Sequence, residues 1–213
     1  MFFSSVLLFQ KKFDPFSSFS AGTYTVSVPY RMRLYIQASS GGGGCGHHPS
    51  TTNSHSGIGM GGSGAGFRGE LVLSKGVITI VVGSGGTHLF GGYPTGGSGG
   101  DTKITLPDGS YILLTGGKGG HGAQGGGVGG AGGVASTNRT DCPSGSLING
   151  TAGSVQSYCA GVTKYGQPNV FSDGTLNDEN VSVYGGSGKV ALTNRGGTSV
   201  IAPASGSILI RKA

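Results

Sequence analysis

The residue types that could bind a metal or do redox chemistry are few, and most of them lie in one stretch. Cys45, His47 and His48 follow a run of four glycines, and His55 comes shortly after. Zinc prefers thiolate and imidazole ligands, but a structural zinc site needs four ligands at a conventional spacing. The sequence offers no second ligand pair beside this group, so we expect a loop here, with no metal site and no other cofactor.

Two further cysteines, Cys142 and Cys159, bracket sixteen residues. In an oxidising compartment a disulfide could close this loop and would stabilise the fold by about 3 kcal/mol in the chain-entropy model. In a reducing compartment both would remain thiols. The sequence leaves both possibilities open, and Cys45 has no partner in either.

Catalytic motifs are weak. Residues 59–64 match G-x-G-x-x-G, but a dinucleotide site also requires a strand before the motif and a helix after it. Glycine this frequent produces such matches by chance. The eight acidic residues lie mostly in turns, and no pair of them suggests glycoside hydrolysis. We therefore expect a protein that is not an enzyme.

The composition excludes several classes of protein. Glycine accounts for 48 of the 213 residues, and charged residues for 10%. Because glycine costs about 1 kcal/mol per helical residue relative to alanine, long α-helices are excluded over most of the chain. Collagen requires glycine at every third position together with abundant proline. No apolar run approaches the roughly 20 residues of a membrane-spanning helix.

The charge is mildly basic. Fourteen basic and eight acidic residues give a net charge of +6. This excess favours weak attraction to anionic surfaces such as lipopolysaccharide or glycan phosphates. The basic residues do not form a run, so no nucleic-acid partner is expected.

Short blocks of alternating apolar and polar residues predict β-strands. They lie at 23–28, 33–38, 70–73, 77–82, 103–106, 111–115, 189–192 and 207–211. Residues 74–76 are predicted to form a hairpin between two of these strands. Residues 107–110 are predicted to form a tight turn in which Pro107 presets φ and Gly109 takes a positive φ.

Glycine in the remaining chain follows a period of three. Residues 116–133 divide into triplets, whose middle positions are Gly117, Gly120, Ala123, Gly126, Gly129 and Gly132. Lys118, His121 and Gln124 form a polar edge, and Val128 and Ala131 a small apolar edge. A polyproline II helix has three residues per turn and no internal hydrogen bonds, so its backbone groups must bond to neighbouring chains.

We therefore predict a bundle of polyglycine II helices that pack through the bare glycine edge. Eighteen residues would reach roughly 56 Å if unbroken, so a turn partway along is expected. The alternative is a flexible glycine linker.

Together these patterns predict an all-β fold, an antiparallel and jelly-roll-like β-sandwich with an inserted polyglycine II bundle and almost no α-helix. Residues 1–18 are predicted to be an amino-terminal docking segment or strand, and residues 19–213 a single domain. A polar, turn-rich surface excursion is predicted at about 136–183.

The order of these blocks resembles a known family. The segments that carry the likeness are 19–29, 33–46, 61–86, 96–120 and 205–213. Together they resemble the glycine-rich domains of bacteriophage tail fibres and their tip adhesins. That resemblance implies a receptor-binding tail protein in which rigid polyglycine helices hold the loops that touch the bacterium. The same order is similar to the extracellular glycine-rich domain of anaplastic lymphoma kinase-type receptors, which binds protein ligands.

We therefore expect a virion structural protein that recognises an outer-membrane protein or glycan on a host cell without catalysis. Other virion tail proteins and copies of the same chain are further expected partners. Contacts are expected at loop tips that carry His88, Phe90, Tyr93, Tyr158 and Tyr165, although these side chains could equally cap the glycine bundle. The alternatives are an architectural fibre, collar or decoration subunit, and an extracellular ligand-binding module.

Overall fold

The computed structural model describes residues 12–18, 20–48, 57–123, 126–157, 163–165, 189–192, 198–201 and 203–213. All regular elements in these ranges are β-strands, and the predicted all-β fold is confirmed. The described part of the chain holds no helix long and apolar enough to cross a membrane.

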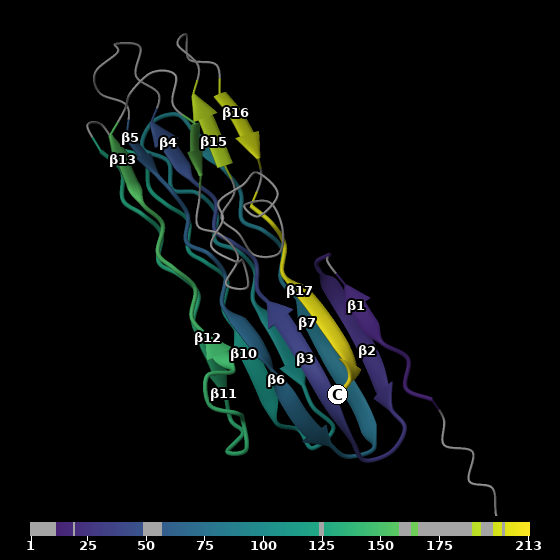
Figure 1. The fold of residues 1–213 in the computed structure, drawn as a ribbon. Coiled ribbons are helices and arrows are strands. Elements are labelled where there is room, and N and C mark those ends of the chain that lie inside the picture. The colour runs from purple at the N-terminus through teal and green to yellow at the C-terminus, as the bar shows by residue number, and fades with distance from the viewer. Residues whose placement is uncertain are drawn as a thin grey trace, which may run out of the picture.

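Two five-stranded antiparallel sheets form a sandwich (Figure 1). The β3 sheet has the strand order β1 (Phe16–Ser18), β17 (Ser207–Lys212), β3 (Met32–Ser39), β6 (Gly66–Leu73) and β12 (Leu147–Ile148). The β7 sheet has the order β11 (Ala135–Thr137), β10 (Tyr111–Leu114), β9 (Thr102–Thr105), β7 (Gly76–Val82) and β2 (Gly22–Val28).

The predicted alternation places one face of each strand in a shared core. On β3, Leu34 and Ile36 are fully buried, while the intervening Tyr35 is only partly covered. On β7, Ile78 and Ile80 are equally buried. Each buried aliphatic side chain contributes about 1.5–3 kcal/mol relative to an exposed one, so the pattern of alternation holds the two sheets together.

One predicted turn is confirmed and one hairpin is wrong. Gly109 has a φ of 81°, and its N–H donates to the carbonyl of Leu106 at 2.9 Å, so β9 and β10 form the expected hairpin. Residues 74–76 instead carry the chain from the β3 sheet to the β7 sheet, because β6 pairs with β3 and β7 pairs with β2. A short link between two amphipathic strands can join neighbours in one sheet or arch over the core, and local sequence does not distinguish the two.

The glycine-rich segments form a lattice of extended helices between the strands. The N–H groups of Gly41 and Gly44 donate to carbonyls in residues 96–100. Between them, the N–H of Gly42 donates to residues 203–206 and the N–H of Gly43 to residues 60–65. These four hydrogen bonds are 2.9–3.1 Å long. The partner repeats after three residues, which is the period of a polyglycine II helix. The predicted polyglycine II bundle is thus present.

The helices of this polyglycine lattice pack in layers. An outer layer contains residues 95–101, 115–121 and 128–134, and the next layer contains residues 83–88, 40–45, 60–65 and 150–154. Each outer helix lies in the groove between two inner ones. Gly117 and Gly120, for example, donate to residues 41 and 44, while Gly62 donates to Lys118 on the other side.

Bare backbone makes this packing possible. A Cβ built on Gly117, Gly120, Gly129 or Gly132 would lie 1.9–2.2 Å from a backbone carbonyl oxygen of a neighbouring segment. Gly126 departs from the predicted edge, because nothing lies within 4 Å of a Cβ there. His121 and Val128 form an antiparallel bridge, so the chain reverses between them as expected, and near this reversal the Cβ direction of Gly126 is open.

Each lattice helix continues a strand, so the two parts of the fold are joined many times (Figure 1). Two small sheets lie at the end of the lattice away from the sandwich. One has the order β13 (Val155–Ser157), β5 (Gly57–Gly59), β4 (Gly46–His48) and β8 (Leu89–Phe90). The other contains β14 (Thr163–Tyr165), β15 (Lys189–Leu192) and β16 (Thr198–Ile201).

The surface excursion predicted at about 136–183 is described by the structure only over residues 136–157 and 163–165, and residues 136–155 are mostly exposed or half-buried. Residues 135–157 supply β11, β12 and β13 to three different sheets, and residues 150–154 form a lattice helix. Their polar composition fits this role, because lattice helices are held by backbone hydrogen bonds and need no apolar side chains.

Candidate binding surface

The outer lattice layer displays its side chains as regular rows. Going away from the small sheets, the rows are Thr95, His121 and Val128; then Ser98, Lys118 and Ala131; then Asp101, Thr115 and Val134. The residues between them along each helix are all glycine. Successive rows are three residues apart, about 9.3 Å at 3.1 Å per residue.

Hydrogen bonds fix the first row. The hydroxyl of Thr95 and Nδ1 of His121 are 2.9 Å apart. His121 and Val128 exchange two backbone hydrogen bonds of 2.8 Å each. Val128 is nevertheless 61% exposed. The row therefore joins a hydroxyl, an imidazole and an aliphatic side chain on a backbone that hydrogen bonds hold in place.

This arrangement corrects one prediction. Lys118 and His121 were expected to form a polar edge separate from the apolar edge of Val128 and Ala131. They lie on the same face, because His121 and Val128 form an antiparallel bridge that brings the second helix alongside the first with its side chains outward. Gln124, the third member of the predicted polar edge, lies outside the described residues.

A tight turn extends the first row. After β8, Gly91 and Gly92 have φ values of 97° and 56°, which only glycine adopts readily. Tyr93 follows and is 62% exposed. The carbonyl of Pro94 accepts a hydrogen bond of 2.9 Å from the N–H of Gly122, which ties this turn to the helix of His121. We call Tyr93, Thr95, His121 and Val128 the distal row.

The other predicted contact residues have different positions. Nδ1 of His88 accepts a hydrogen bond of 2.9 Å from the N–H of Cys45, so this side chain is anchored in the lattice. Phe90 lies in β8 and Tyr165 in β14. Tyr158 lies outside the described residues.

The sequence matches the family described as a glycine-rich domain over residues 18–207. This chain belongs to that family. The match spans both the sandwich strands and the lattice helices, so the two together make up the glycine-rich domain. A comparison with curated proteins found no match.

The two cysteines in the described ranges, Cys45 and Cys142, are both free thiols. Cys45 is fully buried, and burial raises the pKa of its thiol to about 12. The Sγ of Cys142 lies 3.1 Å from the hydroxyl of Ser146, and Cys159, for which the sequence left a disulfide with Cys142 open, lies outside the described residues. No group of three His, Cys, Asp or Glu side chains that could hold a metal ion occurs in the described ranges.

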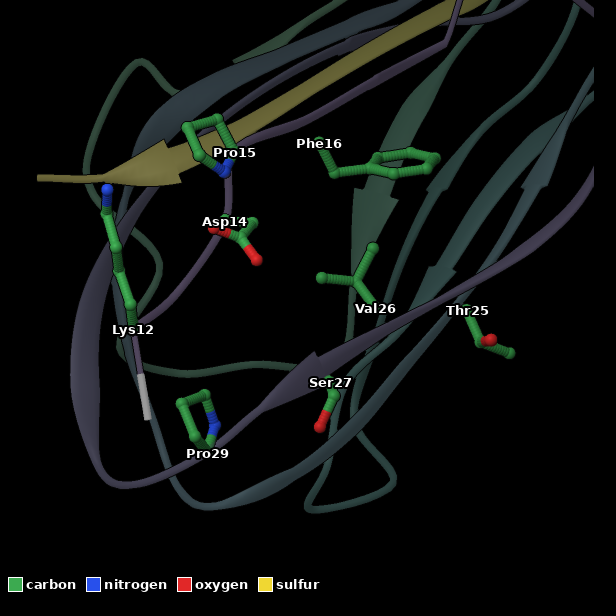
Figure 2. Close-up of a pocket in the computed structure, with 8 residues that line it drawn as sticks. All are labelled: Lys12, Asp14, Pro15, Phe16, Thr25, Val26, Ser27 and Pro29. Carbon is green, nitrogen blue, oxygen red and sulfur yellow. The ribbon is translucent and has the colours of Figure 1, made fainter. Parts of the chain in front are cut away.

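An open cavity of about 310 Å³ lies at one edge of the sandwich (Figure 2). Residues 12–16 lie on one side of it, and residues 25–29 of β2 and the following turn lie on the other. Its only titratable lining groups among the described residues are Lys12 and Asp14. Phe13 is buried nearby and β1 pairs with β17, so this part of the predicted amino-terminal segment covers the edge of the core.

An ion cluster that the sequence did not signal lies at the opposite edge of the sandwich, beside the turn between β9 and β10. The Arg139 side chain is only 7% exposed and forms ion pairs with Asp108 and Asp141. Hydrogen bonds from Ser110 and the charge of Arg139 lower the pKa of Asp108. Arg139, by hydrogen bonding and charge, lowers the pKa of Asp141. All of these groups are satisfied by one another, so the cluster is structural.

Proposed function

We propose that this glycine-rich domain is a non-catalytic recognition module, a tail-fibre or tip adhesin of a bacteriophage virion that binds a receptor on the host cell surface. One observation carries the proposal. Thr95, His121 and Val128 of the distal row lie side by side on a backbone held by hydrogen bonds, Tyr93 lies two residues before Thr95, and Tyr93 and Val128 are each more than 60% exposed.

Such a row has the physical properties of a binding surface. Tyrosine contributes a large contact area with little conformational freedom to lose. A backbone already fixed by hydrogen bonds lowers the entropy cost of binding further. The neighbouring hydroxyl and imidazole supply directional hydrogen bonds for a glycan or a protein loop.

Cell labelling tests the proposal. Fluorescent protein would be incubated with a panel of bacterial strains, and bound fluorescence measured against concentration. We expect labelling of susceptible strains and competition with phage infection. Tyr93→Ala and Val128→Asp should each weaken binding about tenfold, or about 1.4 kcal/mol.

The matched control is Val77→Asp, because Val77 is 52% exposed but lies on β7 of the sandwich. This variant should bind like the original protein. The proposal fails if no strain is labelled, or if all three variants bind alike.

A second candidate function is architectural. Val128, Ala131 and Val134 form an exposed apolar line along one lattice helix, and such a line favours packing against another copy of the chain. Sedimentation velocity distinguishes the two functions. A purely architectural subunit should form oligomers that Val134→Asp disrupts, and it should label no cells.

A further inference from the structure

The outward face of the β3 sheet carries a group of arginines around one tyrosine. Tyr35 on β3 is paired in register with Arg211 on β17, and its neighbour Gln37 is paired with Arg68 on β6. Arg33 lies two residues before Tyr35 on the same face. All three arginines are exposed. We call Arg33, Tyr35, Arg68 and Arg211 the arginine–tyrosine patch.

Tyr35 holds two of the guanidinium groups in place. The Cζ atom of Arg211 lies 4.6 Å from the centre of the Tyr35 ring. Nε of Arg68 donates a hydrogen bond of 2.9 Å to the Tyr35 hydroxyl, which in turn donates to Oε1 of Gln37 at 3.0 Å. Stacking and hydrogen bonding both restrict the rotamers of long side chains, so the charged groups are organised before any ligand arrives.

The local charge is positive. Glu70 is the acidic residue paired with Tyr35 across β6, and its carboxylate lies 3.4 Å from Arg33. The two side chains of that pair are 64% and 50% exposed, and an ion pair so open to water is weak. Three arginines against one glutamate therefore leave a net positive face.

We propose that the arginine–tyrosine patch binds an acidic polysaccharide through its sulfate, phosphate or carboxylate groups. A guanidinium donates two parallel hydrogen bonds to such anions, which makes arginine the preferred residue for them. Arg211 and Arg68 lie on the two strands that flank β3, and their guanidinium groups contact the ring and the hydroxyl of Tyr35. Two cationic groups fixed around one ring on an open sheet face fit anions that repeat along an extended chain better than a single small anion.

This site lies on the sandwich and shares no residue with the distal row. It is therefore independent of the proposed function. The two sites can be tested separately in the same protein.

The probe is a heparin oligosaccharide, with binding measured by titration calorimetry at low ionic strength. The patch variant is Arg68→Gln with Arg211→Gln. The control, Lys75→Gln with Lys103→Gln, removes the same charge from exposed positions elsewhere on the sandwich. We expect binding by the original protein that weakens as salt is added, a loss of tenfold or more in the patch variant, and a change within about twofold in the control.

A third variant, Tyr35→Phe, tests the positioning role of the hydroxyl. It keeps every charge but removes the acceptor for Arg68, so binding should fall by a smaller factor than in the patch variant. Thermal melting shows whether each variant is folded, and Tyr93→Ala should bind heparin normally.

Three results would overturn the proposal. The first is no heparin binding by the original protein, and the second is equal loss in the patch and control variants. The third is patch-dependent binding to phosphatidylglycerol vesicles without binding to heparin, which would make the partner a membrane.

Discussion

At the level of single residues, many lattice positions accept only glycine, because the backbone of a neighbouring segment leaves no room for a Cβ atom. A Cβ on Gly119 would lie 1.7 Å from the carbonyl oxygen of Gly96, a backbone atom that a rotamer change cannot move. That carbonyl belongs to a helix that hydrogen bonds also join to two other helices, from Gly97 to Thr87 and from Gly44 to Gly97. Relieving the overlap would therefore separate several helices at once.

We predict that Gly119→Ala destabilises the protein by at least about 3 kcal/mol or prevents folding, as large overlaps in packed interiors do. Gly126→Ala is the matched control, because it makes the same change in the same segment where nothing lies within 4 Å. It should change the free energy of unfolding by no more than about 0.5 kcal/mol. Urea denaturation measures the free energy of unfolding of both variants. Equally small changes in the two variants would show that the segment is not packed.

At the level of elements, two short connections between amphipathic strands join those strands in different ways. Residues 107–110 join paired strands, whereas residues 74–76 join strands in different sheets. The turn at residues 107–110 is also fixed by a contact with another segment. Arg139, in the loop after β11, forms ion pairs with Asp108 of the turn and with Asp141. The loop after β11 is thereby fixed against the β9–β10 hairpin.

We predict that this ion cluster increases the free energy of unfolding above about pH 4, and that this contribution is lost in acid. Arg139 lowers the pKa of Asp141 in the folded state below its ordinary value near 4. The contribution is therefore present above that ordinary value and disappears as pH falls through the lowered pKa. Asp141→Asn should be less stable than the original protein at pH 7 and should lose less stability on acidification.

Chemical denaturation at a series of pH values measures this dependence. Arg139→Gln should flatten the same part of the curve, and the double variant should add little to either single change. An unchanged acid dependence in Arg139→Gln would contradict the assignment.

At the level of the whole molecule, sandwich and lattice are one structure. β3 continues directly into residues 40–45, β7 into residues 83–88, and β10 into residues 115–121. A lattice helix therefore cannot separate from its neighbours without pulling on a strand of the core. This coupling explains how segments with almost no apolar side chains remain ordered.

We predict that the lattice and the sandwich unfold together. Amides of residues 116–122 and 127–133 should exchange with deuterium at rates similar to those of β10, because both report the same global opening. Hydrogen-exchange mass spectrometry measures this directly. Exchange of the glycine segments within seconds, while β10 stays protected, would show that they are a flexible tether.

Much of this fold follows from local pattern. The strands at 23–28, 33–38 and 77–82 were predicted to within one residue at either end, because alternation depends only on which face is buried. The Gly109 turn follows from the backbone freedom of one residue. The candidate surface was predicted less well. Tyr93 is exposed as expected, but His88 is anchored to Cys45 in the lattice.

The sequence alone determined the all-β class, the period of three in the glycine segments and the need of those segments for neighbours. Only the tertiary structure decided which segments are those neighbours, and so which residues share a face. The reason is that a glycine helix makes its hydrogen bonds through backbone groups that are the same at every position. Its partners are selected by the lengths and directions of the strands that it joins, and these are properties of the assembled fold.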